Sequence, residues 1–98
     1  MKVEFLQLAQ FELDDAFDYY ERQLSGLGAS FIAETTAVLT RIVERPDAWQ
    51  KCSKRTRKCL LHKFPYAVIY QIRDENILIV AIAHQRRKPN YWQTRINN

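Results

Sequence analysis

The chain has 98 residues, of which 47% are hydrophobic and 12% aromatic, and it carries a formal net charge of +4. A chain of this length forms one domain, residues 1–98, and this composition excludes intrinsic disorder. No apolar run reaches the ~20 residues of a membrane span, and the N-terminal MKVEFLQLAQ is too polar for a signal peptide. We therefore expect a cytoplasmic protein that does not bind membranes.

Charge is divided unevenly between the two halves of the chain. Residues 1–48 hold four basic and nine acidic side chains, whereas residues 49–98 hold eleven basic and two acidic ones, so the halves carry −5 and +9. Six of the basic residues fall within 51–63, and three more are consecutive at 86–88. Clustered cations attract anionic partners such as nucleic acid, anionic membranes or acidic proteins. We expect a functional anion-binding surface, with a merely solvated basic face as the alternative.

A short strand and a first helix are predicted at the N-terminus. Alternating apolar residues with few helix signals favour a strand over residues 2–8. From residue 10 to residue 24, apolar residues recur at intervals of three and four, which is typical of a helix with one apolar stripe. The acidic residues of this helix fall on the opposite face and are expected to be solvated. These acids are Glu12, Asp14, Asp15, Asp18 and Glu21, and the apolar stripe is Leu13, Ala16, Phe17, Tyr20 and Leu24.

A second helix is predicted over residues 27–44, because the helical spacing returns there and Pro46 stops the pattern. Both glycines of the protein, Gly26 and Gly28, lie where the first predicted helix ends and the second begins, which favours a tight turn. The two helices therefore form an antiparallel hairpin. Their apolar stripes need a partner, which the second half of the chain supplies.

The second half of the chain changes to an extended pattern. Three strands are predicted, over residues 58–64, 65–73 and 76–84. The last strand is apolar on both faces, so both must be covered, and the tail over 90–96 can cover one of them. The fold class is α+β: an N-terminal strand, an antiparallel helical hairpin, three antiparallel strands and a short C-terminal tail, with the helices on one face of a small sheet.

The residues with the strongest apolar periodicity are predicted to form the core. Truncating any of them to alanine is expected to cost about 2 to 5 kcal/mol if it is fully buried. The predicted core consists of Phe17, Tyr20, Phe31, Leu39, Ile42, Val68, Ile79 and Ile82.

Several kinds of chemistry are excluded by the residues present. The chain has no glycine-rich phosphate loop, since both glycines belong to the helix turn. His62 and His84 stand among basic neighbours, and Cys52 and Cys59 fit neither a disulfide framework nor a zinc site. The basic half has no carboxylate pair suited to a glycosidase. We expect no metal and no cofactor.

What remains is a site of Lys, Arg, His and Tyr side chains, which can bind phosphodiesters and can cut RNA without a metal. Simpler roles stay open for several of these residues. His84 could be a satisfied histidine, Tyr91 and Trp92 could cover the sheet, and Arg95 could pair with an acid of the first helix. The candidates for such chemistry are Lys54, Arg57, Lys58, Arg73, His84, Arg86, Arg87 and Tyr91.

Five segments match the order and spacing of a known pattern over nearly the whole chain. They are YYERQ (19–23), GLGASF (26–31), RIVERPDAW (41–49), RKCLLHKFPYAVIY (57–70) and HQRRKPNYWQTR (84–95). Each segment is weak alone, but together they resemble the RelE/ParE superfamily of toxins from bacterial type II toxin-antitoxin systems. The resemblance implies the small sheet and helical hairpin of that superfamily.

The resemblance also implies a function and partners. It implies a toxin restrained by a cognate antitoxin, in a complex that binds operator DNA through the antitoxin. ParE-like members inhibit DNA gyrase, whereas RelE-like members are mRNA interferases that cut messages on the ribosome. The terminal HxxRxPxYW pattern is closer to the ParE and plasmid-stabilisation members. A further alternative is an inactive relative that only binds an antitoxin.

The candidate site residues fall into two groups, and the resemblance implies family positions for five of them, Lys54, Arg57, Lys58, Arg87 and Tyr91. If the protein is RelE-like, the catalytic residues are Arg57, Lys58, Arg87, Tyr91 and His84. An acidic antitoxin is expected to dock on the basic half of the chain. The further binding residues are Lys54, Arg55, Arg73, Arg86 and Trp92.

Overall fold

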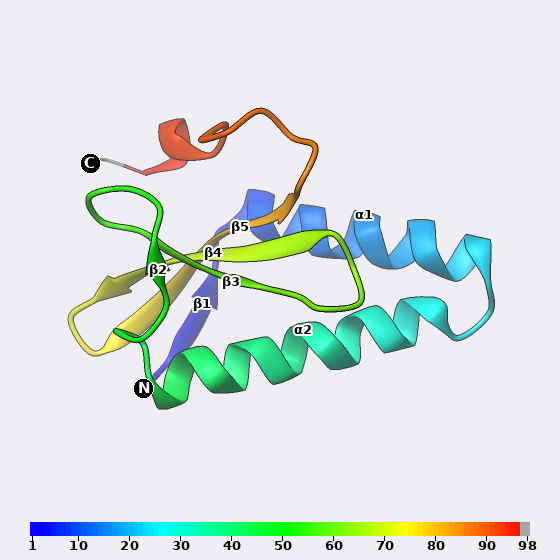
Figure 1. Cartoon of the computed structure of the whole chain (residues 1–98), viewed down its shortest axis with the longest axis horizontal. Helices are drawn as coiled ribbons and strands as arrows, with labels where there is room; N and C mark the ends of the chain where they lie inside the picture. Colours follow the sequence, from blue (N-terminus) through cyan, green and yellow to red (C-terminus); the bar gives the residue numbers. More distant parts are fainter. Residues whose placement is uncertain (97–98) are drawn as a thin grey trace.

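The computed structural model describes residues 1–96, in which one five-stranded sheet carries two helices on one face and the C-terminal tail on the other (Figure 1). The strands lie in the order β1-β5-β4-β3-β2. This arrangement confirms the α+β fold predicted from the sequence. The elements are β1 (Val3–Phe5), α1 (Gln7–Gln23), α2 (Leu27–Glu44), β2 (Gln50–Lys51), β3 (Arg57–Leu60), β4 (Tyr66–Arg73), β5 (Asn76–His84) and the 3-10 helix η1 (Gln93–Arg95).

The first helix begins earlier than predicted, so the strand before it is shorter. α1 starts at Gln7, after Leu6, whose side chain makes no capping hydrogen bond. A helix without a Ser, Thr, Asp or Asn cap gives no start signal in its sequence. The earlier start places Ala9 on the helix, where it is buried in the core. Leu24, which was predicted to belong to the apolar stripe of this helix, is 65% exposed. The bounds predicted for α2 are confirmed.

Glu21 shapes the turn between the helices. Gly26 has a φ of 90°, a left-handed conformation that glycine adopts without strain. The Glu21 carboxylate accepts hydrogen bonds from the backbone N–H groups of Gly26 at 3.0 Å and Gly28 at 2.9 Å. These are N–H groups at the start of α2, which have no partner within the helix. The prediction that Glu21 is simply solvated is therefore wrong.

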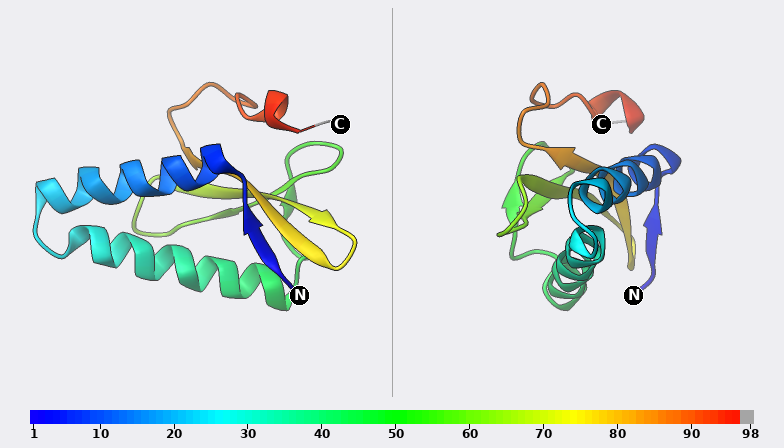
Figure 2. Two further views of the ribbon diagram at one scale, coloured as in Figure 1. Left: turned by 180° about the vertical axis from the view of Figure 1, so that it is seen from behind. Right: turned by 90° about the vertical axis from the view of Figure 1, so that its right-hand side faces the viewer.

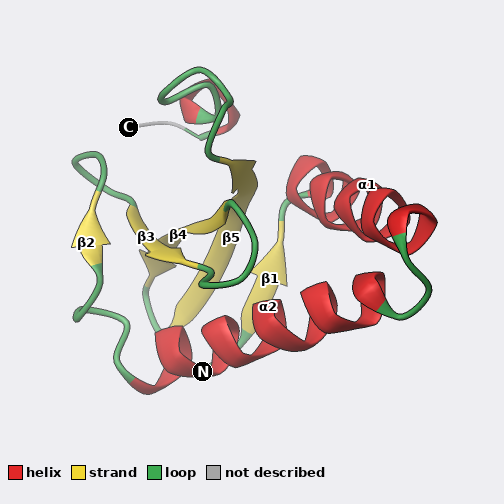
Figure 3. Ribbon diagram, turned by 45° about the vertical axis from the view of Figure 1, so that its right-hand side comes forward, coloured by secondary structure: helices red, strands yellow, loops and turns green. Residues whose placement is uncertain are grey.

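The sheet differs from the predicted one at its two edges. β1 pairs in parallel with β5, with Val3 opposite Ile77, and β2 adds a two-residue strand that the sequence did not predict. The edge strands β1 and β2 lie far apart (Figure 3). β3 ends at Leu60 instead of residue 64, and β4 begins at Tyr66, while the predicted β5 is confirmed.

The helix face of the sheet holds the larger core. The rings of Tyr20, Phe64 and Tyr66 lie 5.2 to 5.4 Å from that of Phe31, centroid to centroid. The predicted core residues Phe31, Ile42, Val68, Ile79 and Ile82 are buried.

Three predicted core residues, Phe17, Tyr20 and Leu39, are only half-buried. Phe17 and Tyr20 belong to the last two turns of α1, close to the turn between the helices. That end of the hairpin projects beyond the sheet (Figures 1 and 2). Apolar side chains of a helix that extends beyond its sheet have no strand to pack against, so they are only partly buried.

The opposite face of the sheet is covered by the C-terminal tail, as predicted. Trp92 and Ile96 pack against apolar side chains of β4 and β5. A β-bulge lies within this face, because Ile69 is opposite Ala81 while Tyr70 is opposite Ile79. Val80 is the extra residue, so Val80 and Ala81 both belong to the tail-side cluster.

Candidate functional site

A concave surface beside β3 and β4 gathers five cationic side chains, and we call it the basic hollow. Four of them, Lys54, Arg55, Arg57 and Arg73, were predicted as site residues, and the structure brings them together. Lys51 belongs to the basic cluster over 51–63 but was not among the predicted site residues, because the two-residue β2 that carries it gives no sequence signal. The lining residues are Lys51, Lys54, Arg55, Thr56, Arg57, Tyr70, Gln71, Ile72 and Arg73.

The loop between β2 and β3 presents two of these cations. The buried Thr56 closes the loop, because its hydroxyl bonds with Ser53 Oγ at 2.6 Å and Cys52 Sγ at 3.3 Å. The Thr56 carbonyl also accepts the N–H of Cys52 at 3.0 Å. Lys54 and Arg55 are therefore exposed on a loop whose ends are fixed.

The two arginines of β3 and β4 in the basic hollow are held mainly by neutral groups. Arg57 Nη1 donates to the Trp49 carbonyl at 2.8 Å, and Arg73 Nε donates to Gln71 Oε1 at 2.5 Å. Arg57 Nη2 is also 4.0 Å from Asp47, but that carboxylate is 86% exposed and neutralises little of its charge. Both guanidinium groups are therefore oriented while most of their positive charge stays available.

Tyr70 lies beneath the basic hollow, fully buried, and its hydroxyl donates to the Pro46 carbonyl at 2.5 Å. Burial raises the pKa of Tyr70 from 10.0 to about 12, although the Arg57 charge acts against the shift. The unfolded chain thus loses this proton at a lower pH than the folded protein. The stability contributed by the neutral Tyr70 is complete below pH 10.0 and is lost as the pH rises toward 12.

We therefore expect alkaline destabilisation that depends on Tyr70. At roughly 1.4 kcal/mol per pKa unit, the loss attributable to Tyr70 should reach about 2 to 3 kcal/mol. Urea unfolding of the wild type and Tyr70→Phe at pH values from neutral to strongly alkaline measures it. The variant should lose less stability than the wild type as the pH rises. Equal losses in the two proteins would contradict this account.

A second group of candidates lines a groove under the C-terminal tail, which we call the tail groove. It contains Lys58, His84, Arg87, Tyr91 and Trp92. Neighbouring residues of a strand point to opposite faces. Arg57 is opposite Tyr70, on the helix face, whereas Lys58 is opposite Ile69, on the tail face. The five predicted catalytic residues are thus divided, with Arg57 in the basic hollow and the other four in the tail groove.

Most side chains of the tail groove have partners within the protein. His84 Nδ1 accepts the N–H of Arg86 at 3.0 Å. The Arg87 guanidinium carbon lies 3.9 Å from the centroid of the Tyr91 ring, a cation–π contact. Trp92 is only 3% exposed, so its ring serves the core. Arg86 is exposed and lies outside both groups of lining residues.

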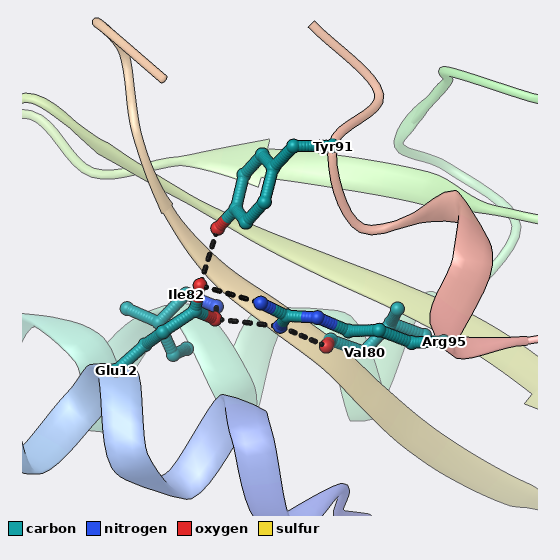
Figure 4. Close-up of polar contacts among 5 residues, drawn as sticks. All are labelled: Glu12, Val80, Ile82, Tyr91 and Arg95. Carbon is teal, nitrogen blue, oxygen red and sulfur yellow. Dashed lines mark hydrogen bonds and ion pairs between the residues drawn. The ribbon is translucent and has the colours of Figure 1, made fainter. Parts of the chain in front are cut away.

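Glu12, Tyr91 and Arg95 form a polar cluster that ties the tail to α1, and we call it the tail clasp (Figure 4). Arg95 donates to both Glu12 oxygens, at 2.8 and 2.9 Å, and the Tyr91 hydroxyl donates to Glu12 at 2.5 Å. The Arg95 and Glu12 side chains are only 11% and 16% exposed. The predicted pairing of Arg95 with an acid of the first helix is confirmed, whereas the prediction of a solvated Glu12 is wrong.

The tail clasp also satisfies backbone groups of β5 next to the bulge. β1 pairs with β5 only as far as Ile79. Beyond that point the Val80 carbonyl accepts from Arg95 at 3.0 Å, and the Ile82 N–H donates to Glu12 at 3.1 Å (Figure 4). Burial, followed by the bond to Glu12, raises the pKa of Tyr91, and the same carboxylate raises the pKa of Arg95. Both groups therefore stay protonated at neutral pH.

Two further findings concern metals and membranes. Across residues 1–96, no three His, Cys, Asp or Glu side chains come together as a metal site. In the same range, no helix is long and apolar enough to cross a membrane. Cys52 and Cys59 are both free thiols.

The fold is similar to that of a chain in the solved structure "Chromosomal ParDE TA system from P. aeruginosa". The TM-score is 0.63 and the match covers 86% of this chain and 95% of that chain, at 14% sequence identity. At this identity the likeness concerns the fold alone. The helical hairpin and the small sheet are thus arranged as in a chain of that ParDE system.

Sequence comparison defines the family. A family described as "ParE toxin of type II toxin-antitoxin system, parDE" matches residues 3–89. Two relatives named Toxin ParE2, from Mycobacterium tuberculosis strains CDC 1551 / Oshkosh and ATCC 25618 / H37Rv, are each 33% identical over 90 residues, covering 88% of this chain and 83% of theirs. The chain belongs to the ParE toxin family. This family supplies the toxins of ParDE type II toxin-antitoxin systems, which implies an antitoxin as the partner of this chain.

Proposed function

We propose that this toxin arrests growth by acting on DNA gyrase. The observation that carries the proposal is that Arg57 lies apart from the other four predicted catalytic residues. Metal-free RNA cleavage needs a base, an acid and a cation at one phosphate. Arg57 lies in the basic hollow, while Lys58, His84, Arg87 and Tyr91 line the tail groove. Together with membership of the ParE family, this division favours a toxin that binds its target over one that cuts RNA.

The bonding of the proton-transfer candidates adds to this argument. The Tyr91 hydroxyl is bonded to Glu12 and its pKa is raised, so it is a poor general base at neutral pH. His84 Nδ1 is already occupied by the N–H of Arg86. These side chains hold the tail and the end of β5 in place, which is a structural task.

Induced expression in cells without the antitoxin tests the proposal. Growth, plasmid topology and the 5′ ends of translated messages are followed in the same cultures. We expect growth arrest with relaxed or broken plasmid DNA and intact messages. Co-expression of the antitoxin should restore growth and topology. Arrest with cut messages and normal topology would refute gyrase as the target, and unaffected growth with soluble toxin present would indicate an inactive relative.

A second candidate function is mRNA cleavage on the ribosome. It is favoured by one observation, that Lys58, His84, Arg87 and Tyr91 line the same groove. If cleavage is the activity, His84→Ala and Arg87→Ala should abolish new message ends while the toxin stays folded. Loss of those ends only in variants that also fail to fold would argue against this function.

We further propose that the antitoxin is acidic and contacts the basic half of this chain, and that the complex binds operator DNA through the antitoxin. Residues 49–98 carry a charge of +9, which accelerates encounter with an acidic partner and makes it depend on salt. Apolar contacts would supply most of the affinity. We propose that the toxin meets its antitoxin and its target in the cytoplasm, where gyrase and translating ribosomes work.

A further inference from the structure

We infer that the basic hollow binds the phosphate backbone of duplex DNA. The inference rests on the proposed function, since it adds a contact between the toxin and the DNA on which gyrase acts. The hollow brings together Lys51, Lys54, Arg55, Arg57 and Arg73 from β2, the following loop, β3 and β4. Within residues 1–96, no acidic side chain lines it. The hollow therefore concentrates positive charge that the protein leaves largely uncompensated.

The lining of the hollow fits nucleic acid better than a protein partner. The centres of protein interfaces are depleted of Lys, Asp and Glu, and their Arg side chains accompany exposed aromatic residues and Met. Here the exposed lining consists mainly of cations, while Ile72 is half-buried. Phosphate groups, in contrast, are bound by Lys and Arg side chains of this kind.

The absence of a stacking surface points to a duplex. Proteins that bind single strands place exposed aromatic rings beneath the bases. Among the described residues, the aromatic ring that lines the hollow is that of Tyr70, which is fully buried with its hydroxyl bonded to Pro46. A surface of cations without exposed rings contacts the backbone and reads no base.

Local structure holds several of these cations in place before a ligand arrives. The Trp49 carbonyl orients Arg57, and the Gln71 side chain orients Arg73. A guanidinium group can donate two parallel hydrogen bonds to the oxygens of one phosphate. Lys54 and Arg55 stand on the loop that Thr56 closes. Less conformational entropy is lost on binding when the binding groups are already oriented.

Direct binding of purified toxin to a short fluorescent DNA duplex of arbitrary sequence tests the inference by anisotropy over a range of salt concentrations. The variant Lys54→Gln/Arg55→Gln removes two exposed cations of the hollow. The matched control Lys2→Gln/Lys63→Gln removes two exposed cations elsewhere. A thermal melt of each protein shows that it is folded.

We expect the hollow variant to bind the duplex roughly tenfold or more weakly, with its salt slope reduced by about 0.9 for each lost phosphate contact. The control should stay within about threefold of the wild type, because distant charges are screened. Equal losses in the two variants would overturn the inference, since net charge alone would then explain binding. Tighter binding of a single strand or of polyglutamate than of the duplex would overturn it as well.

A gyrase supercoiling assay with the same proteins separates this inference from the proposed function. Duplex binding through the hollow without any effect on gyrase would leave the inference standing and refute the proposed target. Inhibition of gyrase by a wild-type toxin that does not bind duplex DNA would support the proposed target and overturn the inference.

Discussion

Removal of the Glu12 carboxylate is expected to be among the most destabilising single changes in this protein. Glu12→Ala should lower the free energy of unfolding by about 3 to 5 kcal/mol, the usual cost of breaking a buried ion pair from one side. The change leaves the Tyr91 hydroxyl and the Ile82 N–H without their acceptor, and it leaves the Arg95 guanidinium with the Val80 carbonyl but without its counter-charge. Urea unfolding measures the loss, with the exposed Asp18→Ala on the same helix as control, expected within about 0.5 kcal/mol of the wild type.

A double variant shows whether the cost comes from the stranded partner. In Glu12→Gln/Arg95→Met the charge of Arg95 is removed together with that of Glu12, so the double variant should be more stable than Glu12→Ala. In a Trp49→Phe background, the fluorescence of Trp92 should report release of the tail in Glu12→Ala. A loss below about 1 kcal/mol with unchanged Trp92 fluorescence would contradict the role assigned to the tail clasp.

The second large effect is expected at Phe31, at the centre of the helix-face core. Its ring is completely buried against Tyr20, Phe64 and Tyr66. Phe31→Ala removes these contacts and leaves a cavity, which should cost about 3 to 5 kcal/mol. The matched control is Phe11→Ala, because Phe11 is 66% exposed on α1 and should be nearly neutral. Similar unfolding free energies for the two variants would contradict the assigned packing.

Most of the architecture could be predicted because it depends on regular patterns. The bounds of α2 follow from its apolar spacing and from Pro46, and those of β5 follow from an unbroken apolar run. α1 was misplaced by three residues at its start because Leu6 supplies no capping side chain. β2 was missed because two residues cannot show a period.

The polar features depended on contacts that local patterns do not encode. Glu12 is one acid among several on α1, and its partner Arg95 lies 83 positions away in the chain. The bulge at Val80 lies in a run that is apolar on both faces of the sheet. The sequence therefore does not show that the alternation of side chains between the two faces shifts by one residue there. Of the candidate site, Lys54, Arg55 and Arg57 were predicted from clustered charge and Arg73 from its place on the next strand. Their separation from Lys58 required the register of β3 against β4.

The proposed action of this toxin on gyrase can be tested with purified components. The decisive measurement adds purified toxin to DNA gyrase, ATP and relaxed plasmid, and follows supercoiling and trapped DNA breaks with and without the antitoxin. We predict that the toxin blocks supercoiling or stabilises broken DNA, and that the antitoxin reverses the effect. Full gyrase activity in the presence of folded toxin, with message cleavage in a translation extract containing the same toxin, would contradict the account.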